Sequence, residues 1–246
     1  MYRVLAGLLV MGGLLSGVMQ VRGADPPAPP AKMTGAQEAA LQTNLELKSW
    51  DARRRGCAKQ LPEHAQIISN LYVHWLDENR AAIHGMLAYA EQSKESSFAF
   101  SVIDAGLPDD VESEAKRYNF SPRDFCARLF AGLKAGDFDI ARSYADVAQA
   151  LAAYMEKHPL SVHGARTFDN PMSCMKSALG RDVNFDSAQG MCRCLWNATN
   201  SEFTQAEWTG YEAAVSGNKP EAVLELAQFK RVKPKIDACA QSLESK

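Results

Sequence analysis

Apolar side chains recur at three- and four-residue steps along most of this chain. The clearest stretch follows Pro62, where this spacing places apolar side chains on one face of an α-helix. We therefore predict one amphipathic helix of about 30 residues in this part of the chain. Its apolar positions are Ile67, Ile68, Leu71, Trp75, Ile83, Met86, Leu87 and Ala90.

A second apolar stripe indicates another long helix, which should end before Pro159 because the residue preceding a proline avoids helical geometry. The stripe consists of Ile140, Tyr144, Val147, Leu151 and Met155. No apolar–polar alternation of strand length occurs in the sequence. The pattern as a whole predicts an all-α fold of about nine or ten helices.

Several helix starts carry capping signals. Ser121 precedes Pro122, a pair typical of the N-cap and the first helical position. Thr204 and Glu207 have the spacing of a capping box. Prolines are also expected to open three further helices, at Pro171, Pro220 and Pro234.

The first 23 residues have the pattern of a secretory signal peptide. Arg3 precedes an apolar run over residues 4–18, which is shorter than the roughly 20 residues that span a bilayer. Light side chains before residue 24 suit a signal peptidase, so cleavage is expected after Gly23. Residues 24–34 contain four prolines and should form an extended tether.

The mature chain is expected to form two helical sub-bundles, over residues 35–159 and 171–246. Residues 160–170 include Ser161 and Gly164 and show no apolar period, so we predict a linker there. At 46% hydrophobic and 23% charged residues, the composition is that of a globular protein. The formal charge of −2 argues against a nucleic-acid partner. After the signal peptide, no apolar stretch has the length of a stable membrane span.

The chain has six cysteines, and an even number in an exported protein predicts disulfides. Cys57 and Cys126 precede the expected linker and are predicted to bond to each other. The other four cysteines follow it: Cys174, Cys192, Cys194 and Cys239.

Helix geometry restricts the pairing of these four cysteines. Cys192 and Cys194 are two residues apart, so on a helix their side chains point about 200° apart. They should therefore bond to different neighbours, namely Cys174 and Cys239, but the sequence leaves open which cysteine takes which partner. The helix that carries them would be crosslinked to two others.

The same region suggests an alternative, in which the protein carries copper. Thiolate and thioether sulfur are ligands that Cu(I) prefers. The candidate metal ligands in this alternative are Met172, Cys174, Met191, Cys192 and Cys194.

Other polar clusters are expected to lie on the surface. The arginines at 53–55 should form a solvated helix face. His64, His74 and His84 recur every ten residues on one predicted helix. This spacing turns successive side chains by about 80°, so the three histidines are not expected to converge on one site.

The sequence contains no catalytic, phosphate-binding or dinucleotide-binding motif, so no catalytic residue and no cofactor are predicted. The leading hypothesis is a non-enzymatic periplasmic or secreted protein that binds a protein partner. An inhibitor, a toxin-neutralising protein or an envelope or secretion accessory factor would fit. A second alternative places an enzyme site or a small-ligand pocket between the sub-bundles, with Trp75, His84 or Tyr144 as candidate groups.

Overall fold

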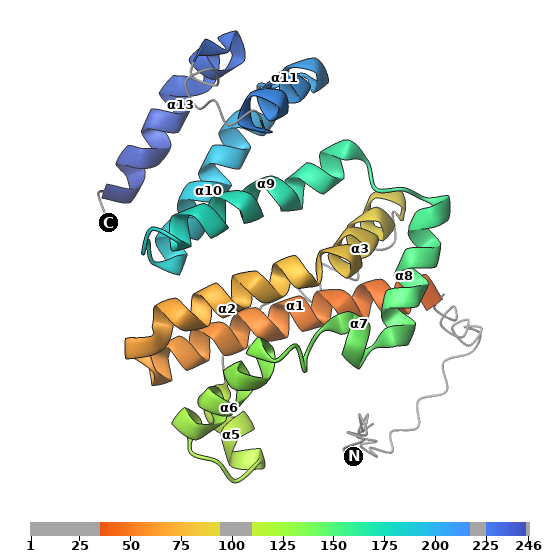
Figure 1. Ribbon diagram of the computed structural model, residues 1–246, viewed down its shortest axis with the longest axis vertical. Coiled ribbons are helices and arrows are strands. Elements are labelled where there is room, and N and C mark those ends of the chain that lie inside the picture. Colours follow the sequence, from red (N-terminus) through yellow and green to blue (C-terminus); the bar gives the residue numbers. More distant parts are fainter. Residues whose placement is uncertain (1–34, 94–109, 217–224, 245–246) are drawn as a thin grey trace, which may run out of the picture. The chain divides into compact units, whose positions relative to one another are not determined.

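The computed structural model describes residues 35–93, 110–216 and 225–244, and every regular element among them is helical (Figure 1). The expected signal peptide, the expected tether and Pro220 lie outside these residues. The helices are α1 (Gly35–Gln60), η1 (Pro62–His64), α2 (Ala65–Glu78), α3 (Arg80–Gln92), α5 (Val111–Arg117), α6 (Pro122–Lys134), α7 (Ile140–Ser143), α8 (Ala145–Lys157), α9 (Val162–Leu179), α10 (Phe185–Asn200), α11 (Gln205–Ser216) and α13 (Ala227–Glu244).

The predicted all-α fold is therefore confirmed, with eleven α-helices and one 3-10 helix in the described residues. The capping predictions at Ser121 and Thr204 also hold. Ser121 Oγ accepts the backbone N–H of Asp124 at the start of α6. At the start of α11, a carboxylate oxygen of Glu207 accepts the N–H of Thr204, and the Thr204 hydroxyl accepts the N–H of Glu207.

The main hydrophobic core is built around two tryptophans on adjacent helices. The ring centroids of Trp50 on α1 and Trp75 on α2 are 5.6 Å apart, and Phe138 lies 5.0 Å from Trp50. The indole Nε1 of Trp75 donates to the carbonyl of Phe138 at 3.0 Å. α3 and α8 pack closely against each other, since a Cβ added at Gly85 would lie 2.6 Å from the Cβ of Leu151.

The predicted helix of about 30 residues is wrong in one respect: it is divided at Asn79 into α2 and α3. Asn79 leaves helical geometry, with φ −93° and ψ 12°. Its amide donates to the carbonyl of Trp75 at 2.8 Å, and its carbonyl accepts the N–H of Ile140 at 2.7 Å. Asn79, at the break, therefore holds the start of α7 by a buried hydrogen bond. The residues around Asn79 in the sequence do not predict this contact.

The second predicted long helix is also divided. Tyr144, with φ −138° and ψ 63°, ends α7 and precedes α8. The change of direction keeps Ile140 and Leu151 both in the core, at 0% exposure, while Tyr144 itself remains 37% exposed. α8 ends at Lys157, as Pro159 predicts.

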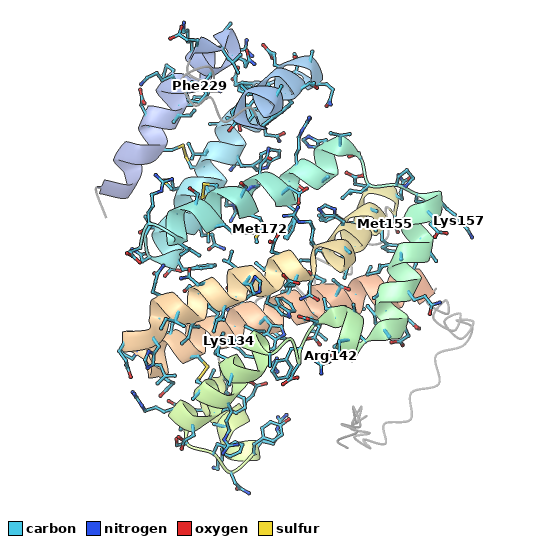
Figure 2. The ribbon with its side chains drawn as sticks, viewed as in Figure 1. Lys134, Arg142, Met155, Lys157, Met172 and Phe229 are labelled. Carbon is cyan, nitrogen blue, oxygen red and sulfur yellow. A yellow bond between two sulfur atoms is a disulfide. The ribbon has the colours of Figure 1, made fainter. Side chains whose placement is uncertain are left out.

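The predicted linker over residues 160–170 is wrong, because most of it belongs to α9. Ser161 caps this helix by accepting the N–H of Gly164 at 2.9 Å. Pro171 lies inside the helix rather than opening it, at the loss of one backbone hydrogen bond. Arg166 and Met172 are buried on either side of this position, which keeps the helix continuous. Met172 projects from α9 toward α2 (Figure 2).

The main core accordingly includes residues from both sides of the expected linker, from Ala39 to Cys192. α9 packs on α2 and α3 as well as on α10, and α10 packs on α13. A smaller cluster buries Phe203, Trp208 and Val232. Pro234 lies inside α13, so the prediction that it opens the last helix is wrong.

Among the described residues, no helix combines the length and the apolar character needed to cross a bilayer.

Candidate functional site

All six cysteines form disulfides. Cys57 on α1 pairs with Cys126 on α6, which is the pairing expected for the first half of the chain. In the second half, α10 is bonded to two different helices, as the geometry of its two cysteines predicts. The pairs are Cys174–Cys192, between α9 and α10, and Cys194–Cys239, between α10 and α13. Three disulfides indicate that the protein folds in an oxidising compartment.

These crosslinks bear on the copper alternative. Cys174, Cys192 and Cys194 have no thiolate to offer in this form, because a metal-binding cysteine must be deprotonated and unbonded. Met172 is buried in the main core. Within the described residues, no group of three or more His, Cys, Asp or Glu side chains is arranged to hold a metal ion.

The arginines at 53–55 do not form a simple solvated face, so that prediction is wrong for Arg54. Its residue exposure is 5%, and its guanidinium lies 3.6 Å from the ring centroid of Phe185. Arg53 is partly buried and makes two hydrogen bonds to the carboxylate of Glu114, at 3.0 and 3.2 Å. Arg53 and Arg54 follow Trp50 by three and four residues on α1, so they lie on the same side of the helix as this buried ring. Arg53 contacts α5, and Arg54 contacts α10.

The structure does not bring Trp75, His84 and Tyr144 together in a pocket. Trp75 is buried in the core, and its indole N–H donates a hydrogen bond to the backbone carbonyl of Phe138. His84 is half-buried, with Nε2 3.1 Å from Asp169 Oδ1 on α9. Burial, reinforced by the nearby Glu46 carboxylate, raises the pKa of the Tyr144 hydroxyl. None of the three lines a cavity described below.

A cavity of about 330 Å³ does lie where α2 meets α9 and α10. Its position is close to the ligand pocket predicted between the sub-bundles, but it is lined by other residues than those predicted. Tyr72 and Leu76 come from α2, Met172 and Met175 from α9, and Phe185 from α10. This cavity is predominantly apolar and belongs to the packing between these helices.

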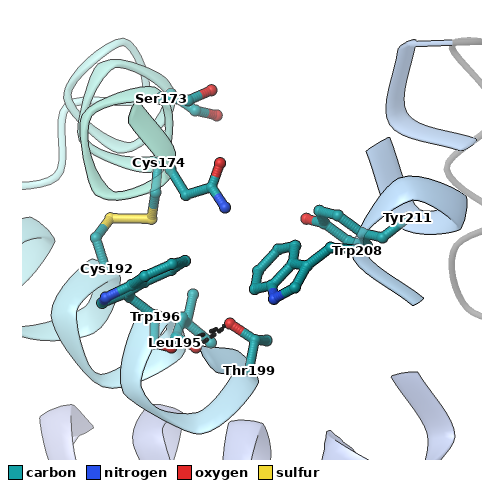
Figure 3. A pocket seen from close by; sticks show the side chains of 10 residues that line it. Ser173, Cys174, Cys192, Leu195, Trp196, Thr199, Trp208 and Tyr211 are labelled. Atoms are coloured by element: carbon teal, nitrogen blue, oxygen red, sulfur yellow. Dashed lines mark hydrogen bonds between the residues drawn. A yellow bond between two sulfur atoms is a disulfide. The ribbon is translucent and has the colours of Figure 1, made fainter. Parts of the chain in front are cut away.

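A second cavity of about 330 Å³ lies between α9, α10 and α11 (Figure 3). Each helix contributes side chains at three- and four-residue steps, which is one face of each helix. The lining residues are Asn170, Ser173, Cys174 and Ser177 from α9, Cys192, Leu195, Trp196 and Thr199 from α10, and Trp208 and Tyr211 from α11. This spacing can be recognised in the sequence, but the sequence does not show which helix faces meet. The Cys174–Cys192 disulfide joins the faces of α9 and α10.

Among the described residues, the most exposed aromatic side chains lie at the turn between α5 and α6. Tyr118 is 53% exposed and Phe120 is 38% exposed. Between them Asn119 has φ 57°, a left-handed conformation that asparagine tolerates better than most residues. The N–H groups of Asn119 and Phe120 return to carbonyls of α5, at 3.1 and 3.0 Å. The turn is therefore a hydrogen-bonded helix end.

This turn is fixed to the core from both sides. The disulfide Cys57–Cys126 bonds α6 to α1, and the Arg53–Glu114 pair joins α5 to α1. Tyr118 stacks on the buried Phe125, with ring centroids 6.1 Å apart and planes inclined by 10°.

Cationic side chains and a shallow hollow adjoin the two aromatic rings. The Arg128 guanidinium lies 4.7 Å from the ring centroid of Phe120. Phe120, Asp124, Ala127, Arg128 and Ala131 line the hollow. We call these five residues, together with Tyr118, the aromatic corner. Lys116 and Arg117 are exposed beside it and, like Arg128, make no ion pair within the described part of the chain.

Sequence reasoning missed the aromatic corner. The signal that points to it is the pair of aromatic residues around Asn119, directly before the cap Ser121. A residue that tolerates the left-handed region, placed between a helix end and a helix start, predicts a tight turn with exposed neighbours.

Comparisons with known proteins do not assign this chain to a family: no family model, no curated protein and no solved structure matches it.

Proposed function

We propose that this protein is an exported, non-enzymatic helical protein that binds a protein partner through the aromatic corner. The signal-like first 23 residues and the disulfides support export, either to the periplasm or out of the cell. The proposal rests on one observation: Tyr118 and Phe120 are exposed on a turn that the Cys57–Cys126 disulfide helps to fix to the core.

The chemistry of the corner resembles the centre of a protein interface. Tyrosine, other aromatic residues and arginine carry most of the binding energy in such interfaces. Tyr118 already stacks on Phe125, so little side-chain freedom is lost when a partner covers it. A rigid turn likewise reduces the ordering cost of association.

The hollow and its charges define the partner. Ala127 and Ala131 are small and exposed, so a partner side chain can approach the surface of α6 between Phe120 and Arg128. Three cationic side chains, Lys116, Arg117 and Arg128, outnumber the one carboxylate of the corner, Asp124, and favour carboxylates at the rim. The partner is therefore a protein surface that presents an apolar side chain flanked by Asp or Glu.

Site-specific photo-crosslinking tests this proposal. A photoreactive phenylalanine analogue replaces Phe120 in one variant and Ile67 in a matched control, since Ile67 is also exposed, at 56%, but lies on α2. The expected result is one saturable crosslinked protein at position 120 in the periplasmic or culture-supernatant fraction, which the Arg128→Glu change removes. Equal labelling at both positions, or labelling that Arg128→Glu leaves unchanged, would argue against the aromatic corner.

A further inference from the structure

The cavity between α9, α10 and α11 has two chemically different sides (Figure 3). On one side lie the rings of Trp196 and Trp208, with centroids 5.6 Å apart, and Tyr211, which meets Trp208 edge to face. On the other side, α9 presents small polar residues, Ser173 and Ser177. The bond between Cys174 and Cys192 closes one end of the space (Figure 3).

One amide in this cavity has an unmet hydrogen-bonding requirement. Asn170 lines the cavity, and its Nδ2 is buried without a hydrogen-bond partner among the described residues. Buried polar groups in folded proteins nearly always have a partner, because leaving one unpaired is unfavourable. The amide therefore calls for an acceptor supplied from outside the described residues.

The aromatic side of the cavity is held in place by surrounding contacts. The guanidinium of Arg166, a residue with 6% exposure, lies 5.3 Å from the Trp208 ring centroid and donates to the side chain of Gln205 at 3.0 Å. Phe203 packs on Trp208, with centroids 4.9 Å apart. The rings are thus positioned before any ligand arrives, which lowers the cost of binding.

The lining determines the charge of a suitable ligand. None of the described lining residues carries a charged side chain. Burial raises the pKa of the Tyr211 hydroxyl, so that group stays neutral at physiological pH. A charged ligand would lose its hydration without gaining an ion pair from these residues. The volume, about 330 Å³, lies at the lower end of the range for small-molecule sites.

From these observations we infer that this cavity binds a small, uncharged aromatic molecule of one or two rings that bears a hydrogen-bond acceptor. The ring lies against Trp196 and Trp208, and the acceptor takes the amide N–H of Asn170. The site is separate from the aromatic corner, and its occupation does not depend on a protein partner.

Three simple probes separate the contributions of ring, acceptor and charge. Benzamide has a ring and a neutral acceptor, toluene has the ring alone, and benzoate carries a charge. Titration calorimetry on the full mature protein measures each affinity, and tryptophan fluorescence gives a second readout, because two of the four tryptophans line the cavity. We expect saturable binding with one site, in the order benzamide, toluene, benzoate.

Variants decide whether Asn170 and the cavity are responsible. Asn170→Leu should raise the dissociation constant of benzamide at least tenfold and leave that of toluene within about threefold. Asn197→Leu is the control, since Asn197 is an exposed asparagine on α10 outside this cavity. Ser173→Phe fills the space from an exposed position and should abolish binding of both probes while the circular dichroism spectrum is kept.

The inference is overturned by any of three results. The first is no saturable binding of benzamide or toluene to the wild-type protein. The second is benzoate binding more tightly than benzamide. The third is an Asn170→Leu variant that binds benzamide as well as the Asn197→Leu control does.

Discussion

The guanidinium of Arg54 lies over the ring of Phe185, 3.6 Å from its centroid. The contact joins α1 to the start of α10 across the main core. Arg54 Nε also donates to Asp51 on its own helix at 3.1 Å, so the buried charge is partly neutralised. Arg54 belongs to a run of arginines predicted to be exposed to solvent, but it is part of the packing between α1 and α10.

We predict that Arg54→Ala lowers the free energy of unfolding by about 2–3 kcal/mol, because it removes a desolvated cation–π contact and its packing. Arg55→Ala is the control from the same run, since its side chain is 40% exposed and surface ion pairs contribute less than about 1 kcal/mol. Urea unfolding followed by circular dichroism measures both. Equal losses in the two variants would show that the contact with Phe185 does not stabilise the fold.

Asn79 should be equally sensitive, for a different reason. Its carbonyl accepts the N–H of Ile140, and Ile140 is completely buried. Asn79→Ala leaves that N–H unpaired and should cost about 2–3 kcal/mol in unfolding free energy. Asn197→Ala, at an exposed position on α10, should change it by less than about 0.5 kcal/mol. A loss below 1 kcal/mol for Asn79→Ala would contradict the role given to this hydrogen bond.

The Cys194–Cys239 disulfide should hold α13 to α10, since the adjoining cluster buries only Phe203, Trp208 and Val232 among the described side chains. Replacing both cysteines by serine should destabilise the protein by roughly 2–4 kcal/mol. Hydrogen exchange should show faster exchange in α13 and unchanged protection in α1.

The matched control for that experiment replaces Cys57 and Cys126 by serine. It should raise exchange in α6 and leave α13 protected, because that bond joins α1 to α6. Uniform loss of protection in both double variants would mean that the two crosslinks support one indivisible unit.

Acid should weaken the junction of α11 and α13. Hydrogen bonds from Arg231, with help from the backbone N–H of Thr204, lower the pKa of Glu207 from 4.5 to about 2. A carboxyl whose pKa is lower in the folded state stabilises the protein above its unfolded pKa. That contribution is lost as the pH falls from about 4.5 toward 2.

Carbon-detected NMR titration of the Glu207 carboxyl tests this directly. Arg231→Ala should move the pKa back toward its ordinary value, since it removes the largest cause of the shift. An unperturbed pKa in the wild-type protein, or one that Arg231→Ala does not change, would contradict the arrangement.

The helix starts with local capping were predictable because their signals lie within four residues. Ser121 with Pro122, and Thr204 with Glu207, act on their own backbone. Helix geometry predicted that Cys192 and Cys194 bond to different helices, and the grouping of the cysteines along the chain left Cys174 and Cys239 as their partners. Which cysteine takes which partner could not be predicted. These features required no knowledge of distant contacts.

The features that were predicted wrongly or not at all share one cause, because each depends on tertiary contacts. The break at Asn79 depends on Ile140, which is 61 residues away. The continuity of α9 through Pro171 depends on buried neighbours that outweigh one lost hydrogen bond. The cavity between α9, α10 and α11 is formed by one face of each of the three helices. The position of Trp196 on α10 alone could therefore not predict it.

The most direct test of the proposed function is the affinity of the captured partner for purified variants, measured by titration calorimetry. Tyr118→Ala should raise the dissociation constant tenfold or more, which corresponds to about 1.4 kcal/mol. Ile67→Ala removes a side chain of similar exposure on α2 and should change it less than twofold. Equal affinities of the two variants would contradict binding through the aromatic corner.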